Sequence, residues 1–246
     1  MIKNLMNNNI FKLSLIVGAV FVLAYLSIVM QEEKIDKACL LISQNENELA
    51  KKEIEGIVSI DRYGTLNETV LMSACKSGNA EMISYLIEND ADPNITVPGG
   101  LYPLELLCNF GYKAGVDSML LLIQNGASQS NYNQRPPVFH LAYQLENIDA
   151  KYKDSVSQMI FELLQLEAPL RNEETTILHL AAKNNAVWLF DKLVHTTQGI
   201  GLLAVEDING NTPWKLSVKH GAIDIQHIIR GLEMELQTES ETPELN

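Results

Sequence analysis

Apolar and polar residues follow one another along most of this chain in a pattern typical of paired helices. Residues 176–182 (TILHLAA) place apolar side chains at helical spacing and end in two alanines, and residues 183–193 give a second apolar helix after a polar break. Because alanine has almost no side chain, a neighbouring helix can lie close to the end of the first one. Such a pair leaves apolar surface uncovered on two sides, and further copies of the pair would cover it.

Further copies of this helix pair are present. The first helices begin at residues 69, 102, 137, 176 and 212, so that successive copies start 33, 35, 39 and 36 residues apart. Gly78, Gly111 and Gly221 stand at the turn between the two helices of three copies, and Asn185 has the same place in a fourth. Glycine tolerates a left-handed turn best, and asparagine is the next best residue there. The sequence therefore predicts an all-α solenoid of about five repeats.

Two segments border the repeats. Residues 31–60 predict a helical cap, because Ile35 and Ile42 belong to one apolar helical face. Residues 61–232 form the predicted repeat domain. Residues 233–246 are acidic and contain no aromatic side chain, so we expect a flexible tail that buries too little apolar area to order itself.

The segment before the cap is predicted to cross a membrane. Residues 13–30 carry no charge and are long enough to span a bilayer as one helix, a signal anchor. The alternative, a cleaved secretory signal, would be shorter and would end in a small-x-small site, which this run lacks. Lys3 and Lys12 precede the helix, and a positive flank remains in the cytoplasm. We therefore expect residues 1–12 in the cytoplasm, a single-pass inner-membrane protein, and the C-terminal domain in the periplasm.

Charge is unevenly distributed along the chain. The formal net charge is −13, and the first 30 residues hold two lysines and no acidic residue, so the remainder carries 16 basic against 31 acidic side chains, a net charge of −15. An acidic surface repels nucleic acid, which we therefore do not expect as a partner. The charge favours a basic protein partner that binds an acidic concave face, although a simple role in solubility explains it equally well.

Residues that could perform chemistry are not grouped in this sequence. Cys75 and Cys108 have the same place in successive repeats, where stacked helices lie roughly 9–10 Å apart, whereas a disulfide needs Cα atoms within about 7 Å. We expect both to be small buried residues. The spacing of the histidines predicts no metal site, and no glycine-rich loop follows a strand to hold phosphate. The prediction is a protein that is not an enzyme, with no catalytic residue, no metal, no cofactor and no small-molecule substrate.

The repeats resemble the ankyrin repeat, whose pattern is a Thr-Pro-Leu-His-x-Ala-Ala helix start, a glycine turn, an apolar second helix and a Gly-Ala-Asp ending. Residues 176–182 and 210–213 (GNTP) match the helix start, while residues 90–92 (DAD) and 126–127 (GA) match the ending. The resemblance covers about residues 60–230. It implies an ankyrin-repeat solenoid.

The family's histidine is present at two of the corresponding positions, His140 and His179, and the other repeats have Met72, Glu105 and Lys215 there. In the family this histidine joins neighbouring turns through hydrogen bonds. The resemblance therefore implies a structural role for both histidines, and a stack that is less regular and less stable than one built from consensus repeats.

The resemblance also implies where a protein partner binds, namely on the loop tips before each repeat and on the outer face of the first helices. Carried over to this chain, these positions are Leu66, Glu68, Leu101, Phe110, Asn133, Gln134, Glu173, Asn184 and Asn209. Leu101 and Phe110 are apolar at positions expected to face solvent, which often marks a contact site; packing against the long third-repeat loop is the alternative. Residues 144–154 and 195–206 exceed a uniform repeat and are either further binding loops or neutral insertions.

Anchoring, irregular repeats and the lack of chemistry resemble the layout of ankyrin-type immunity proteins encoded beside type VI secretion effectors such as lipases. The expected function is therefore that of a membrane-anchored, periplasm-facing module that binds and neutralises one secreted antibacterial effector. The alternative is an envelope scaffold that assembles or protects a periplasmic enzyme.

Overall fold

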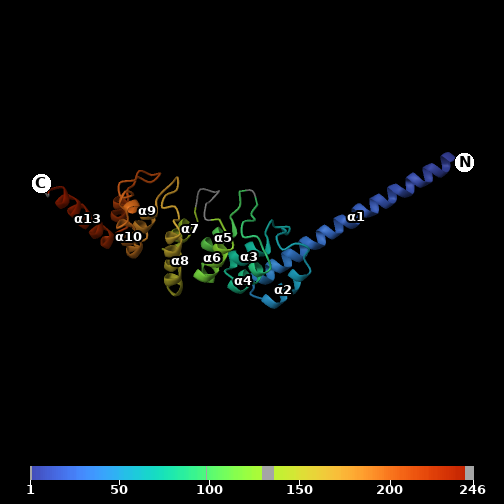
Figure 1. Ribbon diagram of the computed structural model, residues 1–246, viewed down its shortest axis with the longest axis horizontal. Helices are drawn as coiled ribbons and strands as arrows, with labels where there is room; N and C mark the ends of the chain where they lie inside the picture. The colour runs from blue at the N-terminus through green and yellow to red at the C-terminus, as the bar shows by residue number, and fades with distance from the viewer. Residues whose placement is uncertain (1, 98, 129–135, 242–246) are drawn as a thin grey trace.

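The chain folds into an elongated row of helices, shown in Figure 1. The computed structural model describes residues 2–97, 99–128 and 136–241. No strand forms among these residues, apart from an isolated bridge between Arg171 and Thr176. The prediction of an all-α solenoid is confirmed. The α-helices are α1 (Ile2–Ser43), α2 (Asn47–Glu55), α3 (Val70–Ser77), α4 (Ala80–Glu88), α5 (Pro103–Asn109), α6 (Gly115–Gln124), α7 (Pro137–Gln144), α8 (Lys153–Gln165), α9 (Ile177–Lys183), α10 (Val187–Val194), α11 (Thr197–Ile200), α12 (Pro213–Lys219) and α13 (Ile223–Glu241).

Within the described residues, the stack consists of the pairs α3–α4, α5–α6, α7–α8, α9–α10 and α12–α13. The first helices form one continuous row, because α3 contacts α5, α5 contacts α7, α7 contacts α9, and α9 contacts α12. The C-terminal part of α1 extends this row, since it packs on both α2 and α3. Apolar side chains from every pair fill the space between the rows, and their burial drives the stacking.

Local capping explains where the first helices begin. Thr69, Thr176 and Thr212 precede α3, α9 and α12, and the side chain of each accepts a hydrogen bond from a backbone N–H in the first turn. Threonine at this position satisfies one of the N–H groups that a helix leaves without a partner at its start. The recurring threonines of the sequence pattern are therefore helix caps.

The turn residues do not all act in the same way. Gly78, Gly221 and Asn185 have the predicted left-handed backbone, with φ angles of 69°, 67° and 49°. Gly111 differs, because its φ angle is −102°. A Cβ atom at Gly111 would lie 1.7 Å from the carbonyl oxygen of Cys75, so glycine is needed there for the close approach of two repeats. The prediction of a left-handed turn at Gly111 was wrong.

The two repeat cysteines lie in the core. Cys75 and Cys108 are both fully buried and both free, in agreement with the prediction. Burial raises the pKa of each thiol far above its usual value, because the apolar surroundings disfavour a thiolate. Neither sulfur has the thiolate character that a nucleophile or a metal ligand needs.

Helix α1 is continuous from Ile2 to Ser43, so the expected membrane segment and the expected first cap helix form one helix. Its stretch from Leu15 onward is long and apolar enough to cross a membrane, and the most apolar part of that stretch buries nothing against the rest of the chain. Figure 1 shows α1 leaving one end of the stack, with the C-terminus at the opposite end.

The last helix extends into the segment for which the sequence predicts a flexible tail. Helix α13 continues to Glu241, so residues 233–241 are helical, and residues 242–246 lie outside the described residues. Leu232 is buried against the stack, whereas Met234 is 62% exposed. Beyond Leu232 the residues are mostly Glu, Leu, Met and Gln, which favour helix, and a helix that has already formed extends at little cost.

Both of the longer connections are folded against the stack. In residues 144–154, Leu145 and Ile148 are buried in the core, at 6% and 8% exposure. In residues 195–206, α11 forms a short turn whose Gly199 lies against the carbonyl oxygen of Leu193. These connections therefore contribute to the core.

Candidate partner-binding surface

A groove of about 550 Å³ crosses the first helices of the last repeats, and we call it the C-terminal groove. Helices α9 and α12 supply its floor, and the loops that precede them supply its wall. Its side chains combine apolar, acidic and basic groups within one concave surface. They include Tyr143, Glu174, Leu180, Lys183, Asp207, Ile208, Asn209, Leu216, Lys219 and His220.

The wall of the C-terminal groove is a hydrogen-bonded loop. The carboxylate of Asp207 accepts hydrogen bonds from the backbone N–H groups of Asn209 and Asn211, at 2.9 Å and 2.8 Å. Burial alone would raise the pKa of Asp207, but these bonds together with the side-chain amide of Asn211 lower it below its usual value. The backbone N–H of Ile208 donates to the carbonyl oxygen of Glu174 at 2.8 Å, which joins this loop to the preceding one.

The tip of this loop carries an apolar side chain. Ile208 is 73% exposed. It lies between two polar residues on a loop that hydrogen bonds hold in place. An exposed apolar side chain on a fixed loop beside a groove is typical of a contact site for a protein partner. Asn209 of this loop was among the predicted partner-binding residues, and Ile208 was not. The signal available was an isoleucine at the tip of a turn-forming Asp-x-Asn-Gly stretch.

His179 lies below the C-terminal groove and holds two repeats together. Its Nε2 is 2.8 Å from the carbonyl oxygen of Asn211, which can only accept, so Nε2 carries the proton and donates it. Its Nδ1 is then an acceptor for the hydroxyl of Thr176, at 2.7 Å. Burial lowers the pKa of His179, which favours the neutral ring that this geometry requires. This is the role that the ankyrin resemblance implied.

His140 does not make the corresponding hydrogen bond. Its Nε2 lies 3.7 Å from Oε1 of Glu105, and neither atom has a hydrogen-bond partner among the described residues. Both side chains are almost completely buried. The other carboxylate oxygen of Glu105 accepts from the backbone N–H of Tyr102 at 2.8 Å and so caps α5. The position of this pair in the core indicates a structural role.

A second groove, of about 390 Å³, lies at the start of the stack, and we call it the N-terminal groove. Helix α1 forms one side with Asp36 and Leu40, and the loop before α3 forms the other with Leu66 and Glu68. The Asp36 carboxylate accepts a hydrogen bond from the backbone N–H of Thr65 at 3.0 Å, which fixes that loop against α1. Asp36 and Leu40 were not among the predicted partner-binding residues. They lie on the cap helix, and the repeat pattern predicts contact positions only within the repeats.

The predicted partner-binding residues are distributed between several environments. Leu66 and Glu68 line the N-terminal groove, and Asn209 lines the C-terminal groove. The exposed members are Leu66, Phe110, Glu173 and Asn209, and the half-buried ones are Glu68, Leu101 and Asn184. Asn133 and Gln134 lie outside the described residues.

Three of these residues have specific neighbours. Glu68 lies 3.7 Å from the ammonium group of Lys76. The side-chain amide of Asn184 donates to the carbonyl oxygen of Ala142 at 2.9 Å and so links two repeats. Leu101 packs against the core, whereas Phe110 at the end of α5 is 51% exposed. Leu101 and Phe110 were both predicted to face solvent. In the structure Leu101 is partly covered by the core, and Phe110 faces solvent.

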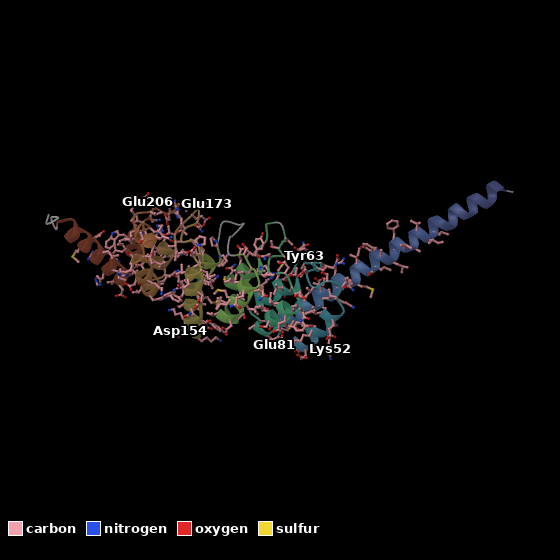
Figure 2. The ribbon with its side chains drawn as sticks, viewed as in Figure 1. Lys52, Tyr63, Glu81, Asp154, Glu173 and Glu206 are labelled. Atoms are coloured by element: carbon pink, nitrogen blue, oxygen red, sulfur yellow. The ribbon has the colours of Figure 1, made fainter. Side chains whose placement is uncertain are left out.

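Charge on the concave side is mixed. Figure 2 shows Glu173 and Glu206 on the loop edge of the stack, opposite Asp154 and Glu81. The floor of the C-terminal groove, however, carries Lys183 and Lys219. Acidic side chains therefore lie on the loop edge, and basic side chains lie on the groove floor. Among the residues that the structure describes, no group of three His, Cys, Asp or Glu side chains could hold a metal ion.

The comparisons with known proteins identify the fold. A family model described as "Ankyrin repeats (many copies)" matches residues 57–107. The chain is also similar to a chain of the solved complex between the predatory endopeptidase Bd0816 from Bdellovibrio bacteriovorus and immunity protein Bd3460. The identity is 15% and the TM-score 0.56, over 77% of this chain and 96% of that one. The fold is therefore an ankyrin-repeat solenoid, and the resemblance to ankyrin repeats is confirmed.

Proposed function

We propose that this protein is a membrane-anchored immunity protein that binds one secreted antibacterial effector in the periplasm and neutralises it. The observation that carries the proposal is the C-terminal groove, with Ile208 exposed beside it on a hydrogen-bonded loop. A groove of this kind offers an apolar anchor surrounded by charged groups, which is the composition of a protein-binding site. The ankyrin-repeat fold supports a binding module in place of an enzyme.

The likeness to the Bdellovibrio complex supports the class of partner. In that complex an endopeptidase is bound to an immunity protein, and the immunity proteins whose layout this sequence resembles are encoded beside type VI secretion effectors such as lipases. Both kinds of target are hydrolases. The partner proposed here is accordingly a hydrolytic effector delivered to the periplasm by a secretion system of the type VI kind.

The surface chemistry indicates what the effector presents to this protein. Glu173, Glu174 and Asp207 lie on the loops that border the C-terminal groove. A surface with basic groups facing these carboxylates and an apolar side chain facing Ile208 complements the border of the groove, and acidic groups on the same surface would face Lys183 and Lys219 on its floor. Binding of such a surface would neutralise the effector by covering it, with no chemistry required from the immunity protein.

The membrane anchor determines the compartment in which this binding would occur. The uncharged run 13–30 is proposed to cross the inner membrane, with Lys3 and Lys12 on the cytoplasmic side. The stack then faces the compartment in which a delivered hydrolase would attack the cell envelope. A phosphatase fused after Asn246 is expected to be active, and an inactive fusion would reverse this topology.

A neutralisation experiment tests the function. Each neighbouring gene product is directed to the periplasm of a host cell, with and without the full-length chain, and cell survival is measured. We expect one of these products to be toxic alone and harmless with the full-length chain, and to be captured by that chain from detergent extract. If none of the neighbouring products is both captured and neutralised, the proposal fails.

A further inference from the structure

A ladder of hydrogen bonds holds α2 and the loop after it against α1. Helix α2 runs antiparallel to the end of α1, so contacts later in α2 reach earlier residues of α1. The ammonium group of Lys37 bonds to Glu53, that of Lys34 bonds to the carbonyl oxygen of Gly56 at 3.2 Å, and the side-chain oxygen of Gln31 accepts from the backbone N–H of Val58 at 2.9 Å. Val58 therefore lies beside Gln31.

The rise of a helix gives the height of this loop above the uncharged run. Gln31 follows Met30, the last residue of the run, and each residue adds about 1.5 Å along the helix axis. Residues Gln31 to Lys34 thus lie within about 6 Å of the end of the run. The polar headgroup layer on each side of a bilayer is about 5–7 Å thick. The loop that hydrogen-bonds to Gln31 and Lys34 therefore lies at the level of the headgroup layer.

The side chain at this height is apolar and uncovered. Val58 is 79% exposed, so the rest of the chain leaves most of its side chain uncovered. The charged residues that flank this height on α1 and α2 are mainly acidic, since Glu32, Glu33 and Glu55 outnumber Lys34. Attraction to anionic lipids therefore does not favour the contact, whereas transfer of an apolar side chain out of water does.

We propose that residues 56–60 form a second membrane contact, in which Val58 enters the headgroup layer of the bilayer that α1 crosses. The inference rests on the proposed anchoring by α1. Because α1 is one continuous helix, anchoring by α1 alone would let α1 and the stack tilt together about the point where α1 leaves the bilayer. A second contact beside that point restricts the tilt and holds the far end of the stack away from the membrane; α9, which contributes to the C-terminal groove, lies at the end opposite α1 (Figure 1).

Depth-dependent fluorescence quenching tests this contact in the full chain. Single cysteines replace Val22, Val58 or Ile208 in a Cys39→Ser background, because Cys75 and Cys108 are fully buried. Each variant is labelled with an environment-sensitive fluorophore and placed in phosphatidylcholine nanodiscs. The lipid is either unmodified or brominated, near the headgroup end of its acyl chains for the labels at Val58 and Ile208 and near their methyl end for the label at Val22. Val58 and Ile208 are matched controls for each other, since they are 79% and 73% exposed.

We expect the labels at Val22 and Val58 to lose fluorescence in brominated nanodiscs, and the label at Ile208 to keep it. Quenching at Val22 without quenching at Val58 would overturn the loop contact and leave the anchoring intact. No quenching at Val22 would overturn the anchoring and, with it, the inference. Equal quenching at Val58 and Ile208 would mean that the stack lies flat on the membrane, which also contradicts the proposal.

Discussion

At the scale of single residues, close approach between neighbouring repeats constrains this chain most strongly at Gly111. The repeat pattern placed a glycine there, but it suggested a left-handed turn as the reason. The actual cause is the carbonyl oxygen of Cys75 in the preceding repeat, where a Cβ atom would lie at 1.7 Å. Such a contact depends on how two repeats stack, so the local sequence around Gly111 cannot reveal it.

Replacing Gly111 with alanine is expected to destabilise the stack. The added Cβ forces the backbones of two repeats apart, and we expect a loss of about 3 kcal/mol in the free energy of unfolding. The matched control is Gly231→Ala in α13, where no atom lies within 4 Å of the new Cβ. That change should stabilise the protein by about 0.5–1 kcal/mol, because alanine favours helix. Denaturant unfolding of both variants measures the difference, and equal stabilities would contradict the packing described here.

His179 is expected to make stability depend on pH. Its pKa is lowered by burial in the folded state, while an unfolded histidine titrates near about 6.5. Below that pH the unfolded chain takes up a proton that the folded chain resists. The stabilising contribution is therefore fully present above about pH 6.5 and is lost as the pH falls towards the lower folded pKa.

Thermal unfolding at about pH 7.5 and about pH 5.5 measures this effect. The unfolding temperature of the wild type should fall between the two, and the fall should be smaller for His179→Gln. The glutamine variant retains an amide that can donate to the carbonyl oxygen of Asn211. An identical fall in both proteins would show that His179 does not titrate as its burial requires.

At the scale of elements, hydrophobic periodicity predicted most of the helix pairs. Periodicity did not predict the features of an element that depend on its packing against neighbouring elements. The boundary expected after Met30 does not interrupt α1, because residues on both sides favour helix and Ile35 and Ile42 dock on the stack. The extra residues 144–154 contain Leu145 and Ile148, which are buried. Their sequence alone did not distinguish a packed insertion from an exposed loop.

The continuity of α1 predicts a fixed geometry between the apolar segment and the stack. Spin labels at Val22→Cys and Leu66→Cys, in a Cys39→Ser background, should give a narrow distance distribution. Adding Glu33→Pro should broaden or shift it, because proline removes a helical hydrogen bond and kinks the helix. The control Glu33→Ala should leave it narrow. A broad distribution without proline would show that α1 is not a continuous rod.

At the scale of the whole molecule, the candidate site was only partly predictable. The resemblance located the concave side and, within it, Leu66, Glu68 and Asn209, which line grooves. It missed Ile208, because the repeat pattern specifies which positions are exposed and not which side chains a particular partner needs. It also missed Asp36 and Leu40, which come from α1, outside the repeats.

The central claim is that the protein binds one effector through the C-terminal groove, and calorimetric titration of the neutralised effector tests it most directly. The variant is Ile208→Asp, and the control is Ile223→Asp, an isoleucine 60% exposed at the start of α13 and outside the groove lining. If Ile208 is an anchor of the interface, its replacement should cost at least about 2 kcal/mol, which is about a thirtyfold rise in Kd. We expect this rise in Kd for Ile208→Asp and wild-type affinity for Ile223→Asp. Unchanged affinity of Ile208→Asp would contradict binding through the C-terminal groove.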